Sequence, residues 1–184
     1  MPKLAREGKI VDAVPVELSD GVKNELKNPG TAKLLTTTDK AGVPHCVCKH
    51  SMVLMEEGYK GCLAFMEMIE GSQTSKNLIW NYDLNRSVAI TTFNPENQSS
   101  FQVKGILYKY IVEGPIWQQF LKATWEMFPM VEPAGVWVVI PTEERDESFM
   151  TRMTEEDTRL QPPHHQWFQY RDASYSRRYG LDKK

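Results

Sequence analysis

The stretch SFQVKGILYKYIVE, residues 100–113, decides the fold class of this chain. Its first apolar residues, Phe101 and Val103, share one face of an extended strand, whereas from Ile106 onward the alternate apolar residues share the other face. Because side chains alternate strictly along a strand, the apolar pattern slips by one residue near Gly105. We expect a bulge or a sharp bend at Gly105, and small β-barrels use such bends to close.

Short strands joined by turns flank this stretch on both sides. Apolar or β-branched runs predict strands at residues 33–38, 43–55, 59–66, 87–93 and 134–140. Polar turn residues separate them, most clearly at 39–42, 56–58 and 94–97. Pro141 is expected to end the last strand. Because strands do not alternate regularly with helices, the pattern favours an α+β fold built on an antiparallel β-barrel rather than a parallel sheet.

A few helices are expected around the barrel. They are predicted between Ser19 and the stop at residues 28–30, at residues 77–82, and at residues 116–128. The third helix carries apolar residues at helical spacing, among them Trp117 and Trp125. We predict that both tryptophans belong to the core.

The composition changes after the last strand. Residues 143–157 are rich in aspartate and glutamate, and Pro162 and Pro163 introduce an end that is aromatic and basic. A segment with so many aromatic side chains is not typical of simple disorder. We therefore divide the chain into a barrel domain, residues 1–147, and a C-terminal extension, residues 148–184, which we expect to dock on the barrel or on a partner subunit.

Length and charge restrict the functions that this chain can have. Its 184 residues suffice for one domain with a sizeable core. The net charge of -2 leaves no broad basic surface, so we expect no nucleic-acid partner. No apolar stretch approaches the roughly 20 residues that span a bilayer, and three cysteines suit a reducing compartment better than a disulfide framework. We expect a cytoplasmic protein with no membrane partner.

The run GSQTSKN, residues 71–77, is the part of the sequence that indicates a ligand. Hydroxyls, an amide and one ammonium group gather there at the expected start of a helix, which is where proteins bind phosphate. Serine and threonine also cap helices for purely local reasons, and the run taken alone favours that interpretation. Its position between the apolar segments 61–66 and 88–93 favours a phosphate site instead.

The run HCVCKH, residues 45–50, does not predict a metal site. On a strand Cys46, Cys48 and His50 share a face, but the outer two lie about 13 Å apart at about 3.3 Å per residue. Ligands of one zinc ion must all lie about 2.0–2.3 Å from it. A disulfide between the two cysteines would be strained as well, so we expect neither a metal nor a disulfide here.

The order of these elements resembles a known family, the FMN-binding split barrel of the pyridoxamine 5'-phosphate oxidase-like superfamily. Within it the chain is most similar to the small bacterial FMN-binding proteins and flavin reductase-like proteins. The resemblance covers about residues 24–147. It rests on the hairpin DKAGVPH at 39–45, the helix-to-strand joint NYDLNRSV at 81–88 and the segment QVKG at 102–105. It implies a dimeric antiparallel split β-barrel with a few peripheral helices.

The resemblance also implies which residues bind FMN. Those that would hold the phosphate are Gln73, Thr74, Ser75, Lys76 and Asn77. Those of the extended segment that would bind the edge of the isoalloxazine ring are Cys48, Lys49, His50 and Ser51. Family members form homodimers with the flavin at the interface, and the contacts expected from the other subunit are Gln102, Lys104 and Trp137.

The function implied is that of an FMN-dependent oxidoreductase with a small-molecule or protein redox partner. The flavin supplies the redox chemistry, so the resemblance assigns no catalytic residue. Two alternatives stay open: a non-catalytic flavin binder or electron carrier, and a binder of another cofactor, haem or a deazaflavin. Haem would need an axial histidine, for which His50 and His164 are the candidates. Oxidation of pyridoxamine phosphate itself is less favoured, because an Arg-rich motif near the C terminus is not evident.

Overall fold

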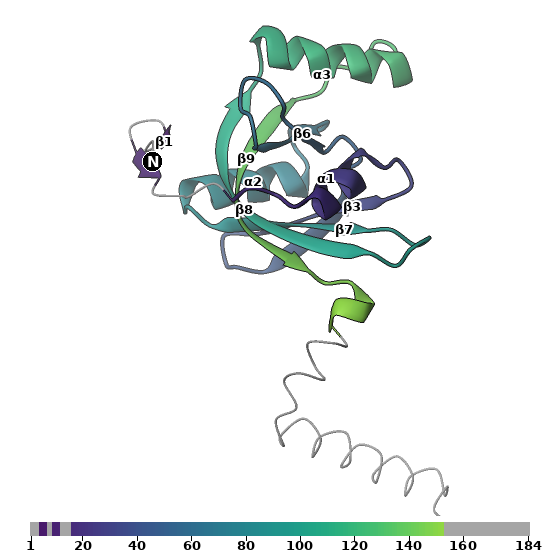
Figure 1. The fold of residues 1–184 in the computed structure, drawn as a ribbon. Helices are drawn as coiled ribbons and strands as arrows, with labels where there is room; N and C mark the ends of the chain where they lie inside the picture. The colour runs from purple at the N-terminus through teal and green to yellow at the C-terminus, as the bar shows by residue number, and fades with distance from the viewer. Residues whose placement is uncertain (1–3, 7–8, 12–15, 153–184) are drawn as a thin grey trace, which may run out of the picture. The chain divides into compact units, whose positions relative to one another are not determined.

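The computed structural model describes residues 4–6, 9–11 and 16–152, and most of its elements are labelled in Figure 1. The chain divides into two compact units, Met1–Ser148 and Phe149–Lys184. In the second unit residues 149–152 are helical. The segment that begins at Pro162 lies outside the described residues, so the docking of the C-terminal extension stays a prediction.

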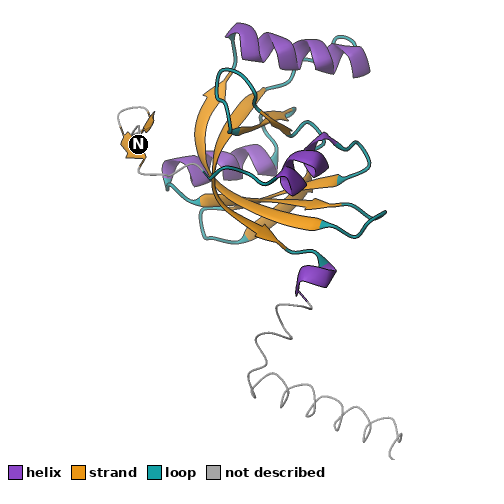
Figure 2. Ribbon diagram, viewed as in Figure 1, coloured by secondary structure: helices purple, strands orange, loops and turns teal. Residues whose placement is uncertain are grey.

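One antiparallel sheet of seven strands forms the centre of the first unit (Figure 2). Its strand order is β4-β3-β7-β8-β9-β6-β5, and every neighbouring pair is antiparallel. The strands are β3 (Ala32–Thr38), β4 (Pro44–Cys48), β5 (Val53–Leu54), β6 (Leu63–Glu67), β7 (Ser87–Phe93), β8 (Ser100–Ile111) and β9 (Gly135–Asp146). A separate two-stranded sheet pairs β1 (Leu4–Arg6) with β2 (Lys9–Val11). The prediction of an α+β fold on an antiparallel sheet is confirmed.

The irregularity predicted at Gly105 is present in the pairing of β8 with β9. Lys104 pairs with Glu143 but Gly105 pairs with Pro141, so Thr142 is the extra residue of a bulge. A Cβ atom on Gly105 would lie 2.4 Å from a methyl of Val139 and 2.7 Å from a backbone oxygen, so this position requires glycine. A second register shift, between Leu107 and Lys109, was not predicted.

Four predicted boundaries are wrong, each for a local reason. The strand predicted at residues 59–66 begins only at Leu63, because turn hydrogen bonds from Tyr59 N to Glu57 O and from Cys62 N to Tyr59 O precede it. Pro141 does not end the last strand, because it lies at the bulge and β9 continues to Asp146. Residues 43–55 do not form one strand, because a turn closed by Met52 N and Lys49 O separates β4 from β5. The second helix begins at Gln73, four residues before the predicted start, because the cap is Ser72.

The helices are α1 (Asp20–Lys27), α2 (Gln73–Asp83) and α3 (Gly114–Met127). The core consists of two clusters, one on each face of the central strands. The first includes Leu35, Phe65, Leu78, Val103, Trp137 and Val139, and the second includes Ala64, Phe120, Val136, Val138 and Ile140. Successive residues in the first part of β9 alternate between the clusters, so residues 135–141 are buried on both faces and their sequence is apolar.

Helix α3 contributes less to the core than its apolar stripe suggested. Only Phe120 and Thr124 are buried, Trp117 is half-buried, and Trp125 is 46% exposed. The prediction that Trp125 is a core residue is therefore wrong. The helix lies beyond the ends of β8 and β9, where only a narrow stripe can reach the second cluster (Figure 1).

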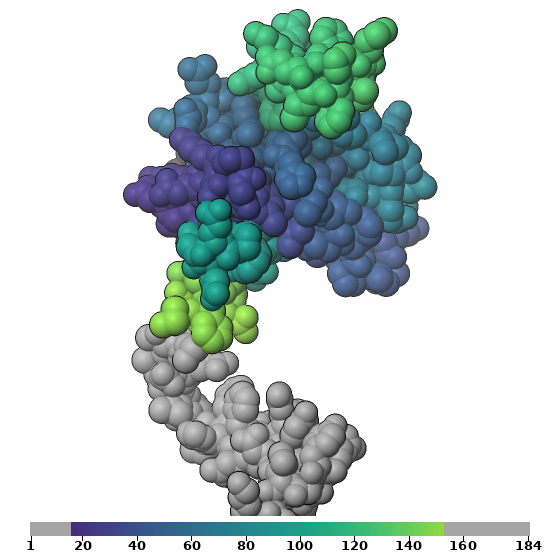
Figure 3. All heavy atoms as spheres, turned by 90° about the vertical axis from the view of Figure 1, so that its right-hand side faces the viewer, coloured from purple at the N-terminus to yellow at the C-terminus, as the bar shows by residue number. Residues whose placement is uncertain are grey.

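A buried carboxylate, that of Glu25, joins α1 to the β7–β8 hairpin. It accepts hydrogen bonds from Ser99 Oγ at 2.6 Å, Asn94 Nδ2 at 3.1 Å, Asn97 Nδ2 at 3.3 Å and Thr31 Oγ1. In Figure 3 the purple atoms of α1 lie against the teal atoms of this hairpin. Burial raises the pKa of the Glu25 carboxyl, but the four hydrogen bonds together lower it below its ordinary value.

Candidate functional site

The start of α2 is the best-formed polar site of the described chain. Ser72 caps the helix, and its Oγ accepts a hydrogen bond from Ser75 N at 2.9 Å. The first backbone N–H groups of a helix have no intrahelical partner and carry a partial positive charge. The run GSQTSKN is therefore both a helix cap and a place where an anion would be stabilised.

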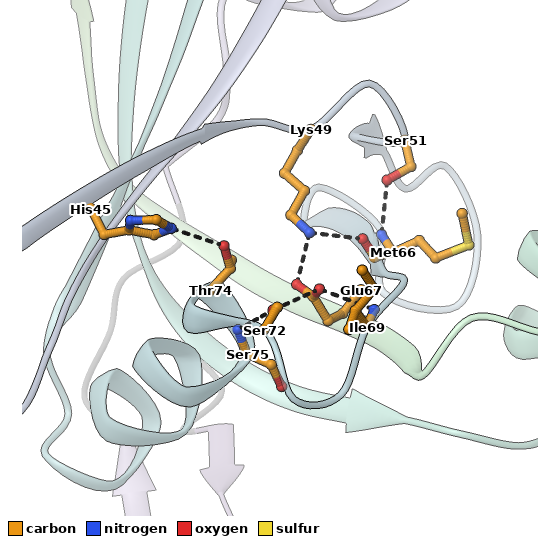
Figure 4. A network of polar contacts seen from close by, with 9 residues as sticks. All are labelled: His45, Lys49, Ser51, Met66, Glu67, Ile69, Ser72, Thr74 and Ser75. Carbon is orange, nitrogen blue, oxygen red and sulfur yellow. Dashed lines mark hydrogen bonds and ion pairs between the residues drawn. The ribbon is translucent and has the colours of Figure 1, made fainter.

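An ion pair lies beside this helix start. Lys49 Nζ is 2.7 Å from Glu67 Oε2 and 3.4 Å from the carbonyl oxygen of Met66. The other oxygen of Glu67 accepts from Ser72 Oγ at 3.1 Å and from Ile69 N at 3.4 Å (Figure 4). The Glu67 side chain is only 3% exposed. The carboxylate of Glu67 is thus an internal anion surrounded by donors.

Further hydrogen bonds hold the surrounding segments in place. Thr74 Oγ1 lies 3.3 Å from His45 Nε2, which connects α2 to β4. Asn77 Nδ2 donates to Thr37 Oγ1 at 3.2 Å, which connects α2 to β3. Ser51 Oγ accepts from the backbone N–H of Met66 at 3.0 Å (Figure 4). The helix start, the end of β6 and the segment after β4 therefore form one polar assembly.

The structure brings about half of the predicted site residues into this assembly. Those with contacts in it are Lys49, Ser51, Gln73, Thr74, Ser75 and Asn77. Three other predicted residues from the same two segments are exposed, namely Cys48, His50 and Lys76. Their side chains have no hydrogen bond or ion pair within the described part of the chain.

The residues predicted to contact the flavin from a second subunit lie elsewhere in the chain. Lys104 is paired with Glu143 at 3.0 Å, and Gln102 lies on the same strand, β8. Trp137 is 5% exposed and stacks between Tyr82, at 5.8 Å, and Tyr110, at 4.7 Å. Within one chain the Trp137 ring is therefore a core side chain.

Three residues of the assembly were not among the predicted site residues: His45, Glu67 and Ser72. Ser72 was detectable, because serine directly before an expected helix is a common cap. Glu67 was detectable only in part, because it follows an apolar strand and charged residues are rarely buried without a partner. Nothing in the local pattern indicated that this partner is Lys49.

Burial, and to a smaller extent the charges of Glu70 and Glu67, raise the pKa of the Tyr110 hydroxyl. This phenol is therefore protonated and can donate a hydrogen bond at neutral pH. Burial raises the pKa of the Cys62 thiol, so that cysteine is a poor nucleophile. The other two cysteines, Cys46 and Cys48, are exposed free thiols.

No protein-family model and no curated protein matches the sequence. Among solved structures, HupZ of Group A Streptococcus matches with a TM-score of 0.58 and 18% identity, over 72% of this chain and 95% of that chain. A putative pyridoxamine 5'-phosphate oxidase from Lactobacillus delbrueckii matches with a TM-score of 0.53 and 19% identity, over 70% and 93% of the two chains. An FMN-binding protein from Syntrophomonas wolfei matches with a TM-score of 0.53 and 10% identity, over 71% and 86%.

The chain shares the fold of these solved structures, an antiparallel split β-barrel. This confirms the predicted fold class, and at these identities the likeness concerns the fold alone. Among the helices of the described residues, none is long and apolar enough to cross a membrane. The described residues of the split barrel also contain no cluster of three or more histidine, cysteine, aspartate or glutamate side chains that could hold a metal ion.

The split barrel also has an apolar groove between the β5 region and α3. Its volume is about 790 Å³. It is lined by residues 53–58 and by Pro115, Ile116, Gln119, Phe120 and Ala123. None of the predicted site residues lines it, so the groove and the polar assembly at α2 are different surfaces.

Proposed function

We propose that this split barrel binds FMN and acts as a homodimeric cytoplasmic oxidoreductase with a small-molecule or protein redox partner. The observation that carries the proposal is the polar assembly at the start of α2. There an ammonium group, serine and threonine hydroxyls and a helix N-terminus converge beside the segment that follows β4. The fold, shared with a solved FMN-binding protein, supports the same assignment.

The donors of this assembly fit the phosphate of FMN. Lys49 offers a charge-assisted hydrogen bond, Thr74 a hydroxyl, and the first turn of α2 its backbone N–H groups. Lys76 follows on the exposed side of the same helix and would add a second positive charge. The backbone of residues 48–51 would bind the edge of the ring. When bound, the flavin supplies the redox chemistry.

A second subunit would complete the site. We propose that Gln102, Lys104 and Trp137 contact the flavin of the other subunit across a dimer interface. Exposed apolar side chains provide surface that a second copy can bury, and large ones are Val112, Trp125, Met127, Phe128 and Met130.

The first test is the absorption spectrum of the purified full-length protein, followed by titration with FMN. We expect flavin absorption or saturable FMN uptake. Haem or a deazaflavin as the resident cofactor would give a different spectrum. A colourless protein that takes up no FMN would overturn the proposal.

The second test measures the FMN dissociation constant of lysine variants. Lys49→Ala should weaken binding by about tenfold or more, because a hydrogen bond to a charged group contributes about 1.5–3 kcal/mol. Lys76→Ala should also weaken binding, but less, because that side chain is exposed to solvent. Lys122→Ala is the matched control, since Lys122 is an exposed lysine on α3 and its removal changes the net charge equally. Equal effects of all three variants would contradict the assignment of the phosphate to α2.

A further inference from the structure

We propose that Glu67 controls access of a phosphate group to this site, because its carboxylate holds Lys49 in the free chain and a bound phosphate must replace it there. The inference rests on the proposed function and deepens it, since it assigns a specificity-determining residue to the same site. Glu67 was not among the residues expected to bind the cofactor.

The contacts of Glu67 are those that a phosphate at this place would need. One oxygen pairs with Lys49 Nζ at 2.7 Å, and the other accepts from Ser72 Oγ at 3.1 Å and from Ile69 N at 3.4 Å. Ammonium, hydroxyl and backbone N–H are the donors by which proteins usually bind phosphate. In the free chain all three serve the carboxylate (Figure 4).

Because the ion pair of Lys49 and Glu67 is buried, a phosphate can bind Lys49 only in competition with Glu67. The Glu67 and Lys49 side chains are 3% and 12% exposed, so little water screens their charges. A phosphate monoester carries about 1.5–2 negative charges at pH 7. Placed next to Lys49 it would also lie next to Glu67, and two anions so close repel each other strongly in a poorly solvated site.

A neutral side chain of the same shape would remove that repulsion. In Glu67→Gln the amide oxygen can still accept from Ser72 and Ile69, while the ammonium of Lys49 loses its competing anion. If the ion pair were only structural, the same substitution would loosen the helix start and weaken phosphate binding. Whether Glu67→Gln strengthens or weakens FMN binding therefore distinguishes control of phosphate access from a purely structural role of the ion pair.

The experiment compares FMN with riboflavin, which has the same ring but no phosphate. Dissociation constants are measured by flavin fluorescence on the full-length protein at fixed ionic strength. We expect Glu67→Gln to bind FMN about ten- to a hundredfold more tightly than the natural sequence, as the loss of a close like charge predicts. Its affinity for riboflavin should change less than about threefold.

Glu70→Gln is the matched control, because Glu70 lies three residues after Glu67, is exposed and loses the same charge. Its FMN affinity should change less than about threefold, because exposed charges are screened by salt. The double variant Lys49→Ala/Glu67→Gln should lose the gain of the single variant. Glu67→Ser is measured alongside, because it replaces the carboxylate by a smaller neutral polar side chain. It tests the same prediction if Glu67→Gln does not fold.

The outcomes distinguish the two proposals. If the natural sequence binds FMN and both Glu67 variants that fold bind it equally or more weakly, the role of Glu67 is refuted and FMN binding stands. An equal gain for FMN and riboflavin also refutes that role, because the effect would not involve the phosphate. If neither the natural protein nor any folded variant binds FMN, the proposed function fails, and the inference fails with it.

Discussion

Replacing Glu25 by glutamine should destabilise the barrel without touching the proposed flavin site. Glu25 is 7% exposed and accepts hydrogen bonds from four side chains, three of them in the β7–β8 hairpin. Glutamine has nearly the same shape, but it is neutral and one of its two oxygens is replaced by an NH₂ group. That NH₂ group would face the side chains of Asn94 and its neighbours, which are themselves donors.

The magnitude follows from the contacts that change. A hydrogen bond to a charged group contributes about 1.5–3 kcal/mol, and a buried donor left without an acceptor costs about 1–3 kcal/mol. Glu25→Gln weakens all four bonds and removes the acceptor of about one, so we expect a loss of about 3 kcal/mol in the free energy of unfolding. For a chain of this size that corresponds to a decrease in Tm of about 6–12 °C.

The pH dependence tests the role of charge. The folded-state pKa of Glu25 is lower than its ordinary value, so the stabilisation is complete above the unfolded pKa of about 4.3. It is lost as the pH falls through the folded-state pKa, because the protonated carboxyl resembles the amide. Urea unfolding at pH 7 and at pH 3.5 should therefore show that the difference between natural protein and variant narrows at low pH.

Glu56→Gln is the control for this experiment. Glu56 pairs with Lys27 of α1 at 3.0 Å, but both side chains are more than two-thirds exposed, at 73% and 67%. Its loss should cost about 0.5 kcal/mol or less. The reasoning would be refuted if Glu25→Gln were as stable as the natural protein at pH 7, or if its deficit were equally large at pH 3.5.

Two further predictions concern stability. Gly105→Ala should lower the free energy of unfolding, measured with urea, by about 2 kcal/mol or more, because the new methyl would meet Val139 and the backbone of Ile140. Gly71→Ala is the control: no atom lies near the added Cβ, so it should cost less than about 0.5 kcal/mol. Equal effects of the two substitutions would contradict the steric argument. Lys33→Met should raise the free energy of unfolding at pH 7 by about 1 kcal/mol, because Lys33 is 8% exposed and burial lowers the pKa of its ammonium. Because the pKa of Lys33 is lowered by folding, the natural protein gains stability as the pH rises. The difference in the free energy of unfolding between Lys33→Met and the natural protein should therefore shrink toward pH 10. A difference that grows with pH would contradict the prediction.

Much of the fold was predictable from the sequence, because strand alternation, turns and helix caps depend on residues that are neighbours in the chain. The register shift at Gly105 and the capping serine of α1 appear in the structure where the sequence indicated an irregularity and a cap. The predicted slip of the apolar pattern does not lie at Gly105, because Val103 and Leu107 belong to the same core cluster and β8 changes face only after Leu107, at its second register shift. Boundaries were less predictable. Pro141 ordinarily ends a strand, and only its pairing opposite Gly105 at a bulge shows why β9 continues past it.

The candidate site was predictable in its residue types but not in its pairing. Hydroxyl and ammonium groups at the start of α2 indicated an anion site, and the resemblance to the family indicated Lys49 and Ser51. Neither source indicated His45 or Glu67, because a buried contact between distant segments leaves no periodic trace in a sequence.

The sequence by itself determined the α+β class, an irregularity of strand pairing at Gly105 and the polar helix start at residues 71–77. Only the tertiary structure decided what faces that helix start. Lys49 follows β4, at one edge of the sheet, and Glu67 ends β6, next to the opposite edge. The two meet at 2.7 Å because the sheet curls and brings its edges together. Rules that relate neighbouring residues along the chain cannot predict this contact.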